Sequence, residues 1–139
     1  MTSLLTPMLA LIIWTLFMWL WMYATRLPAM HKAGIDATKI RRKGELDILP
    51  VEVSRIADNY NHLHEQPTVF YALVVYGHLV GAETVWLTGL AWAYVVFRVA
   101  HSLVQALWNF VPARFAVFVL STLTLIGMAG IVTGVTLAG

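Results

Sequence analysis

Cysteine is absent from this chain of 139 residues, and charged side chains are scarce. Without a thiol the protein cannot form disulfides, thiolate zinc sites or iron–sulfur clusters, so any sulfur chemistry must come from a substrate. Charged residues make up 12% of the chain and hydrophobic residues 60%, whereas soluble domains typically carry about 25% charged residues. The composition therefore excludes a water-soluble globular domain and predicts a membrane protein with a single domain, residues 1–139.

Basic residues are few, and they gather beside apolar segments. The net charge is only +2, and the longest polar stretch, residues 26–50, holds most of the cations: Arg26, Lys32, Lys39, Arg41, Arg42 and Lys43. A nucleic-acid partner would require Lys and Arg spread across a soluble surface, so we expect no nucleic acid. Next to a membrane, such a cluster is typical of a segment that contacts anionic lipid headgroups.

Four segments are apolar enough and long enough, at about 20 residues, to cross a lipid bilayer. We expect spans over residues 4–25, 51–81, 84–108 and 113–137, joined by a loop over residues 26–50 and two short turns. Arg26 is expected to end the first span, and the second is expected to be one long helix that Pro67 can kink. The predicted fold class is all-α, an integral membrane up-down four-helix bundle.

The cations also predict an orientation. Arg26, the loop that follows it, Arg55 and Arg114 all map to one side of the predicted bundle, and no Lys or Arg maps to the other side. By the positive-inside rule the loop is cytoplasmic, and both termini lie outside the cytoplasm.

Several ionisable residues fall inside the apolar segments, where each costs about 2.5 kcal/mol or more. In antiparallel spans joined near Ala82, residues lie at the same depth when their numbers add up to about 164. This rule pairs Glu65 with Arg98 as a buried ion pair. It also places His62 level with Ser102 or His101, Asn59 with Gln105, and Arg55 with Asn109. The facing stripes indicate a polar pocket open to the cytoplasm, or polar contacts that only hold the helices together.

A metal site is the other interpretation of these residues. His62 and Glu65 share a helix face, and His101 could approach them from the next span. The spacing lacks a His-Glu-x-x-His motif, and Arg98 at the same depth would repel a cation. We therefore expect no metal site.

The segment Arg55-Ile-Ala-Asp-Asn-Tyr-Asn-His-Leu-His-Glu-Gln-Pro-Thr resembles the MAPEG family, the membrane-associated proteins in eicosanoid and glutathione metabolism. The resemblance covers essentially the whole chain and is strongest to a bacterial branch. Family members are four-helix proteins with a polar first loop and an Arg-x-x-x-Asn-x-x-Glu motif at the start of the second helix. The resemblance implies a homotrimer in a bacterial inner membrane.

The resemblance also implies roles for individual residues. Arg55 and Asn59 match the part of the motif that grips glutathione, and His62 and Glu65 follow where the motif has its Glu. His101 and Gln105 stand where glutathione-binding members often have tyrosines. The two implied catalytic residues, Arg98 and Arg114, could stabilise a thiolate, because a guanidinium lowers the pKa of a nearby thiol.

The function implied is a glutathione-dependent transferase or peroxidase, with glutathione as co-substrate, that acts on small lipophilic electrophiles. The alternative is a non-enzymatic membrane protein whose polar residues are structural or bind a lipid or a partner.

Overall fold

The computed structural model describes residues 3–35, 39 and 48–139. These residues form the helices α1 (Leu5–Lys32), α2 (Val51–His62), α3 (Gln66–Leu79), α4 (Val85–Leu103) and α5 (Val111–Ala138), with a π-helical turn, η3 (Val104–Trp108), that continues α4. No strand occurs in the part of the chain that the structure describes.

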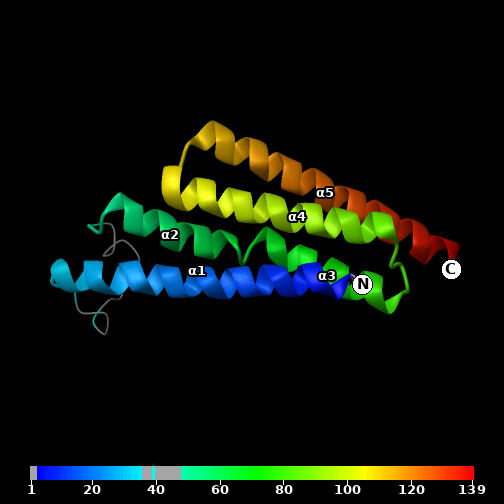
Figure 1. Ribbon diagram of the computed structural model, residues 1–139, viewed down its shortest axis with the longest axis horizontal. Coiled ribbons are helices and arrows are strands. Elements are labelled where there is room, and N and C mark those ends of the chain that lie inside the picture. The colour runs from blue at the N-terminus through cyan, green and yellow to red at the C-terminus, as the bar shows by residue number, and fades with distance from the viewer. Residues whose placement is uncertain (1–2, 36–38, 40–47) are drawn as a thin grey trace.

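The helices make four antiparallel rods, which are α1, α2 followed by α3, α4 followed by η3, and α5 (Figure 1). Both termini lie at the same end of the bundle (Figure 1). Among the described residues, three helical stretches are long and apolar enough to cross a membrane, namely Leu5–Lys32, Val85–Trp108 and Val111–Ala138. The predicted fold class, an all-α membrane bundle, is confirmed.

The first helix is longer than predicted. It passes through Arg26 and Pro28 and ends at Lys32, just before Gly34, whose φ of 73° lies in the left-handed region. The expected end of the apolar span at Arg26 is therefore not the end of the helix. An arginine can carry its charge to the membrane surface while its backbone stays helical, so it marks the end of the apolar segment and not the end of the helix.

The second rod is two helices and not the single long helix that the sequence predicted. α2 ends at His62, and α3 begins at Gln66 with Pro67 in its first turn. Glu65 lies in the break with φ −99° and ψ −95°, outside the helical region. Proline cannot donate to the carbonyl four residues earlier, here that of Leu63, and its ring crowds that carbonyl. The chain relieves this conflict by ending one helix and starting another.

The other two rods begin at residues suited to the start of a helix. Thr84 accepts a hydrogen bond from the Leu87 backbone N–H at 3.1 Å, which caps the start of α4. α5 begins at Val111, two residues earlier than predicted, because Pro112 fits the first turn of a helix. In the short turn before α4, the His78 imidazole pairs with the Glu83 carboxylate.

Apolar packing joins the rods in the middle of the bundle. The rings of Phe70 on α3 and Tyr94 on α4 stack with centroids 4.4 Å apart and an interplanar angle of 15°. Gly77 on α3 allows a close approach, because a Cβ built there would lie 3.3 Å from both Leu4 and Val132. The outer faces of α1 and α5 instead expose large apolar side chains such as Leu20 on α1, as suits contact with hydrocarbon.

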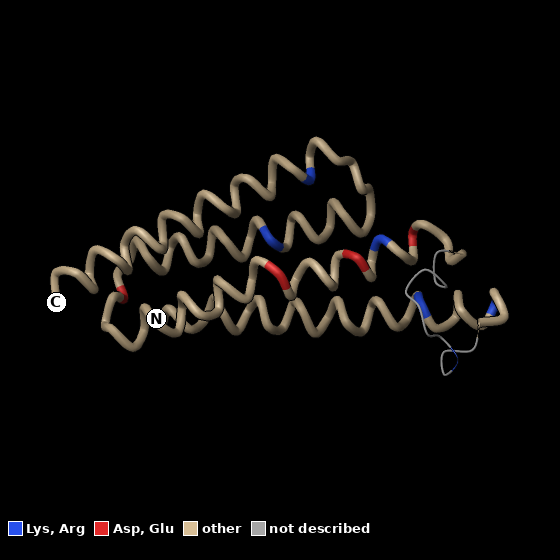
Figure 2. Tube along the Cα trace, turned by 180° about the vertical axis from the view of Figure 1, so that it is seen from behind, with Lys and Arg blue, Asp and Glu red and all other residues tan. Residues whose placement is uncertain are grey.

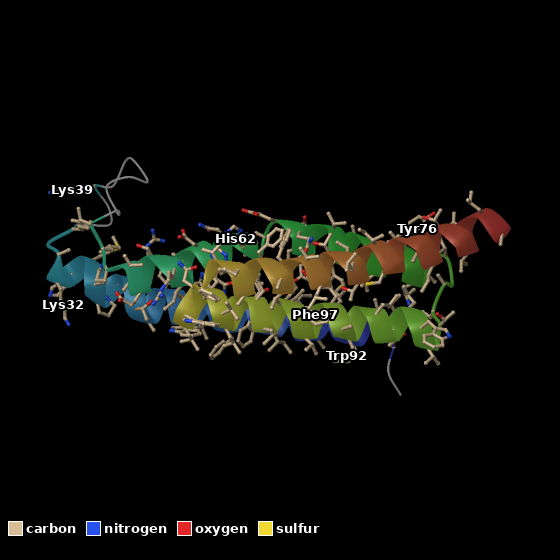
Figure 3. All side chains as sticks on the ribbon, turned by 90° about the horizontal axis from the view of Figure 1, so that it is seen from above. Lys32, Lys39, His62, Tyr76, Trp92 and Phe97 are labelled. Carbon is tan, nitrogen blue, oxygen red and sulfur yellow. The ribbon has the colours of Figure 1, made fainter. Side chains whose placement is uncertain are left out.

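The Lys and Arg residues that the structure describes all lie away from the end of the bundle that holds the two chain termini (Figure 2). Lys32 and Lys39 lie at one end, and Tyr76 lies toward the other (Figure 3). Glu83 lies in the turn near the two chain termini, and no described Lys or Arg accompanies it there (Figure 2). The predicted cations Arg41, Arg42 and Lys43 lie outside the described residues.

Candidate functional site

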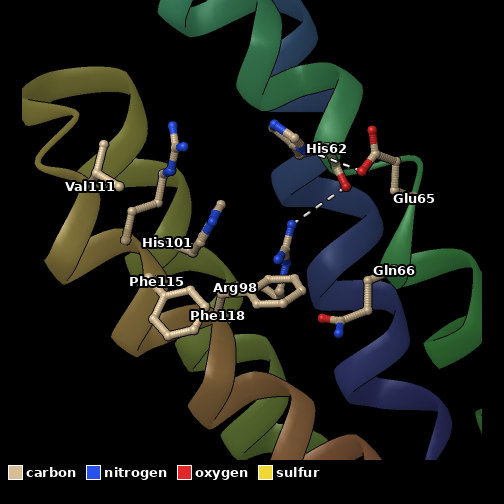
Figure 4. Close-up of a pocket in the computed structure, with 9 residues that line it drawn as sticks. His62, Glu65, Gln66, Arg98, His101, Val111, Phe115 and Phe118 are labelled. Atoms are coloured by element: carbon tan, nitrogen blue, oxygen red, sulfur yellow. Dashed lines mark hydrogen bonds and ion pairs between the residues drawn. The ribbon is translucent and has the colours of Figure 1, made fainter.

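A pocket of about 300 Å³ lies among the break after α2, the cation-bearing half of α4 and the first turns of α5 (Figure 4). Ionisable and amide side chains line one part of it, and aromatic and aliphatic side chains line the rest: His62, Glu65, Gln66, Arg98, His101, Val111, Arg114, Phe115 and Phe118. The pocket therefore combines cationic donors with an apolar wall.

Arg98 is almost completely buried, with 1% of its surface exposed, and it points toward the end of α2 (Figure 4). Its Nη2 donates to the backbone oxygen of His62 at 3.4 Å. His62 is the last residue of α2, and the final carbonyls of a helix lack partners within the helix. A cation at this position also faces the negative end of the helix dipole. Arg98 thus caps α2 from the neighbouring rod.

The predicted ion pair between Glu65 and Arg98 is wrong. The Glu65 side chain is 67% exposed, and its Oε2 pairs instead with Nδ1 of His62 at 3.2 Å. The depth rule assumed one continuous helix from Val51 onward, whereas the chain turns at Leu63–Glu65 and carries the carboxylate outward. The rule holds where α2 is still helical, because the rings of His62 and His101 lie with centroids 6.4 Å apart.

Arg114 lies in the first turns of α5, and its Nη1 donates to Oδ1 of Asn109 at 2.9 Å. Arg98 and Arg114 come from adjacent rods and line the same pocket. Glu65 is the carboxylate in the lining, and it is already paired with His62. The two guanidinium groups therefore make the pocket suitable for an anion.

Three of the eight predicted site residues, Arg55, Asn59 and Gln105, do not line this pocket. Nη1 of Arg55 donates to the backbone oxygen of Trp108 at 3.3 Å, close to the predicted level of Asn109. Trp108 ends η3, so Arg55 on α2 caps the α4 rod just as Arg98 on α4 caps α2.

Between these two capping contacts lies a polar seam, which we define as the facing side chains Asn59 of α2 and Ser102 and Gln105 of the α4 rod. All three are fully or almost fully buried. Both side-chain polar atoms of Asn59, Oγ of Ser102 and Oε1 of Gln105 have no hydrogen-bond partner among the described residues. A buried polar atom without a partner costs about 1–3 kcal/mol. The seam therefore does not join the helices by side-chain hydrogen bonds.

Gln66 was not among the predicted site residues, although it continues the polar stripe of Arg55, Asn59 and His62. Its Nε2 donates to Oγ1 of Thr122 at 2.8 Å, its Oε1 accepts from the Tyr94 hydroxyl at 3.2 Å, and Ser121 Oγ lies 3.3 Å from the same oxygen. Gln66 thus links three rods beside the pocket.

The apolar wall was also missed. Phe118 follows Arg114 by four residues and Phe115 follows Val111 by four, so each pair shares a face of α5. That spacing is the signal that could have identified them. Among the described residues, no group of three or more His, Asp or Glu side chains is arranged to hold a metal ion.

These features define a multi-pass helical membrane protein with a polar pocket beside an apolar wall. A model of the MAPEG family matches residues 4–134, and the chain belongs to this family. The family includes membrane transferases and peroxidases that are related to glutathione. Searches of curated proteins and of solved structures gave no significant match.

Proposed function

We propose that the protein binds glutathione in the pocket and activates its thiol for reaction with small lipophilic electrophiles or peroxides. The observation that carries the proposal is that Arg98 and Arg114 face one pocket whose other wall is formed by Val111, Phe115 and Phe118. The cationic part suits a thiolate or a carboxylate, and the apolar part suits a substrate that arrives from lipid.

The chemistry needs no protein thiol. A guanidinium favours the thiolate form, so it lowers the pKa of a bound thiol from about 8.5 toward neutral. In a transfer reaction the thiol proton passes to solvent, the sulfur forms a bond to the electrophilic carbon, and the leaving group departs with its electron pair. We assign the stabilisation of the thiolate to Arg114 and Arg98, and the contact with the glutathione backbone to His62, Glu65 and His101.

The second candidate function is structural, and the capping contacts of Arg55 and Arg98 favour it. Each guanidinium already donates to the backbone oxygen of the last residue of a neighbouring helix, Trp108 of η3 for Arg55 and His62 of α2 for Arg98. On this view the arginines hold α2 against the α4 rod, and glutathione does not bind. For Arg55 we favour this role over glutathione binding, because Arg55 does not line the pocket.

We further propose that three copies assemble in a bacterial inner membrane, with residues 26–50 in the cytoplasm. Gly130 and Gly134 on α5 support the assembly, because a Cβ at either would meet nothing within 4 Å in this chain. Close helix packing in membranes uses such small residues. Native mass spectrometry of the detergent-solubilised protein should therefore detect three copies.

The test of function compares glutathione with the analogue in which serine replaces its cysteine. Both should raise the midpoint of thermal unfolding at millimolar concentration, since both carry the same carboxylates. Only glutathione should react with a chlorodinitrobenzene electrophile. In Arg114→Ala the pH profile of the conjugation rate should move up by about one pH unit, which slows the reaction at pH 7 by about tenfold.

Arg26→Ala is the matched control, because Arg26 lies on α1 and does not line the pocket. It should leave both the unfolding midpoint shift and the pH profile unchanged. If neither ligand stabilises the protein and no conjugation occurs, the structural candidate is favoured and the glutathione proposal is wrong.

A further inference from the structure

The junction between the α4 rod and α5 consists of two residues, Asn109 and Phe110, and the first has an unusual backbone. Asn109 has a φ of 56°, and in the described part of the chain it is the one non-glycine residue with a positive φ. Its backbone N–H donates to the Val104 oxygen and so closes the π-helical turn. Asparagine tolerates the left-handed region better than most residues do. The backbone here therefore favours asparagine or glycine.

The neighbours of Asn109 are held on both sides. The backbone oxygen of Trp108 accepts the hydrogen bond from Arg55, and the indole of Trp108 stacks on the ring of Phe110 with centroids 4.7 Å apart. Because Trp108 and Phe110 are held and the π-helical turn is closed, the Asn109 side chain can point in few directions.

That side chain meets the pocket arginine. Oδ1 of Asn109 accepts from Nη1 of Arg114 at 2.9 Å, and within the described chain no other side-chain hydrogen bond of Arg114 is present. Because amides are neutral, this contact fixes the guanidinium without cancelling its charge. A carboxylate at the same place would hold the guanidinium as well but would neutralise it.

We infer that Asn109 is a positioning residue, which holds the Arg114 guanidinium at the pocket while leaving its positive charge available to an anionic ligand. The effect of Arg114 on an anionic ligand rests on the proposed function, whereas the positioning of Arg114 by Asn109 rests on the hydrogen bond between them. It assigns two requirements to one residue, namely a left-handed backbone and a neutral acceptor.

Two substitutions test the second requirement and separate the presence of an acceptor from its neutrality. Asn109→Gly keeps the backbone but removes the acceptor, and Asn109→Asp keeps an acceptor but adds a negative charge. The first measurement is the rate at which phenylglyoxal modifies Arg114, followed by peptide mapping of the wild-type and variant proteins in detergent. We expect modification about threefold or more faster in Asn109→Gly and slower in Asn109→Asp.

The second measurement is the pH profile of glutathione conjugation. Both variants should shift it to higher pH, the glycine variant because Arg114 is no longer held and the aspartate variant because its charge is neutralised. When Arg114→Ala is already present, adding Asn109→Gly should cause no further shift. The two variants should thus change the modification rate of Arg114 in opposite directions but shift the pH profile in the same direction. A merely structural role of Asn109 would not produce this pattern.

The inference is overturned if Asn109→Gly keeps the wild-type modification rate, or if that rate rises while the pH profile stays unchanged. If the wild-type protein neither binds glutathione nor conjugates it, the proposed function fails, and the modification rates alone decide whether Asn109 positions Arg114.

Discussion

Replacing Ser102 by alanine should stabilise the protein, whereas the same replacement at Ser121 should destabilise it. Both serines are completely buried within helices, on α4 and α5 respectively. Oγ of Ser102 has no hydrogen-bond partner among the described residues. Oγ of Ser121 donates to the Phe118 oxygen at 2.8 Å and contacts Oε1 of Gln66 at 3.3 Å. The two sites therefore differ mainly in hydrogen bonding.

The magnitudes follow from the contacts. Alanine favours a helix over serine by roughly 0.5 kcal/mol at either site, and the lost oxygen atom leaves a similar small void in each. At Ser102 the substitution also removes the cost of an unpaired buried hydroxyl, about 1–3 kcal/mol. At Ser121 it removes hydrogen bonds that are worth about 0.6–1.7 kcal/mol between membrane helices. We expect the two variants to differ by about 3 kcal/mol in free energy of unfolding, because the gain at Ser102 and the loss at Ser121 have opposite signs.

The assay is reversible unfolding in mixed micelles with increasing sodium dodecyl sulfate, followed by tryptophan fluorescence and circular dichroism. Comparison of the two variants cancels the helix-propensity term and most of the void term. Equal destabilisation of both variants would refute the reasoning, because it would mean that Ser102 has a partner as valuable as those of Ser121.

Two further predictions use the same assay. Glu65→Gln should change the free energy of unfolding by less than about 0.5 kcal/mol, because the carboxylate is exposed and does not pair with Arg98. A loss of about 3 kcal/mol would instead indicate a buried ion pair between Glu65 and Arg98. Gly77→Ala should destabilise by about 1–3 kcal/mol, because its Cβ would press on Leu4 and Val132. Gly89→Ala, whose Cβ would meet nothing within 4 Å, should raise the free energy of unfolding by up to about 1 kcal/mol. If Gly89→Ala proves less stable than Gly77→Ala, the packing described at these two glycines is wrong.

The number of rods and their antiparallel order could be predicted from the sequence, because the lengths of the apolar segments and the short turns between them determine both. The level of His62 with His101 also followed, since both helices are regular there. The error at Glu65 arose where Pro67 stops the helix. A proline predicts a disturbance, but the choice between a kink and a three-residue break depends on what the freed carbonyls can contact.

Parts of the site were beyond sequence reasoning for a different reason. The π-helical turn adds a residue to one turn of the α4 rod and changes the direction of everything after Trp108. No composition signal marks such a turn. The contact between Asn109 and Arg114, and the place of Phe115 and Phe118 in the pocket wall, depend on that change of direction.

The break between α2 and α3 limits the length of this rod that lipid tails can surround. α3 has 14 residues and therefore reaches only about 21 Å along its axis, short of the roughly 30 Å of a hydrocarbon layer. Irregular backbone at membrane depth survives only against protein or in a water-filled recess. His64 and Glu65 are exposed there, so we expect this surface to be closed to lipid tails and reached by water, beside the pocket. In the proposed function, a co-substrate dissolved in water and a substrate dissolved in lipid would then approach the same pocket from two different phases.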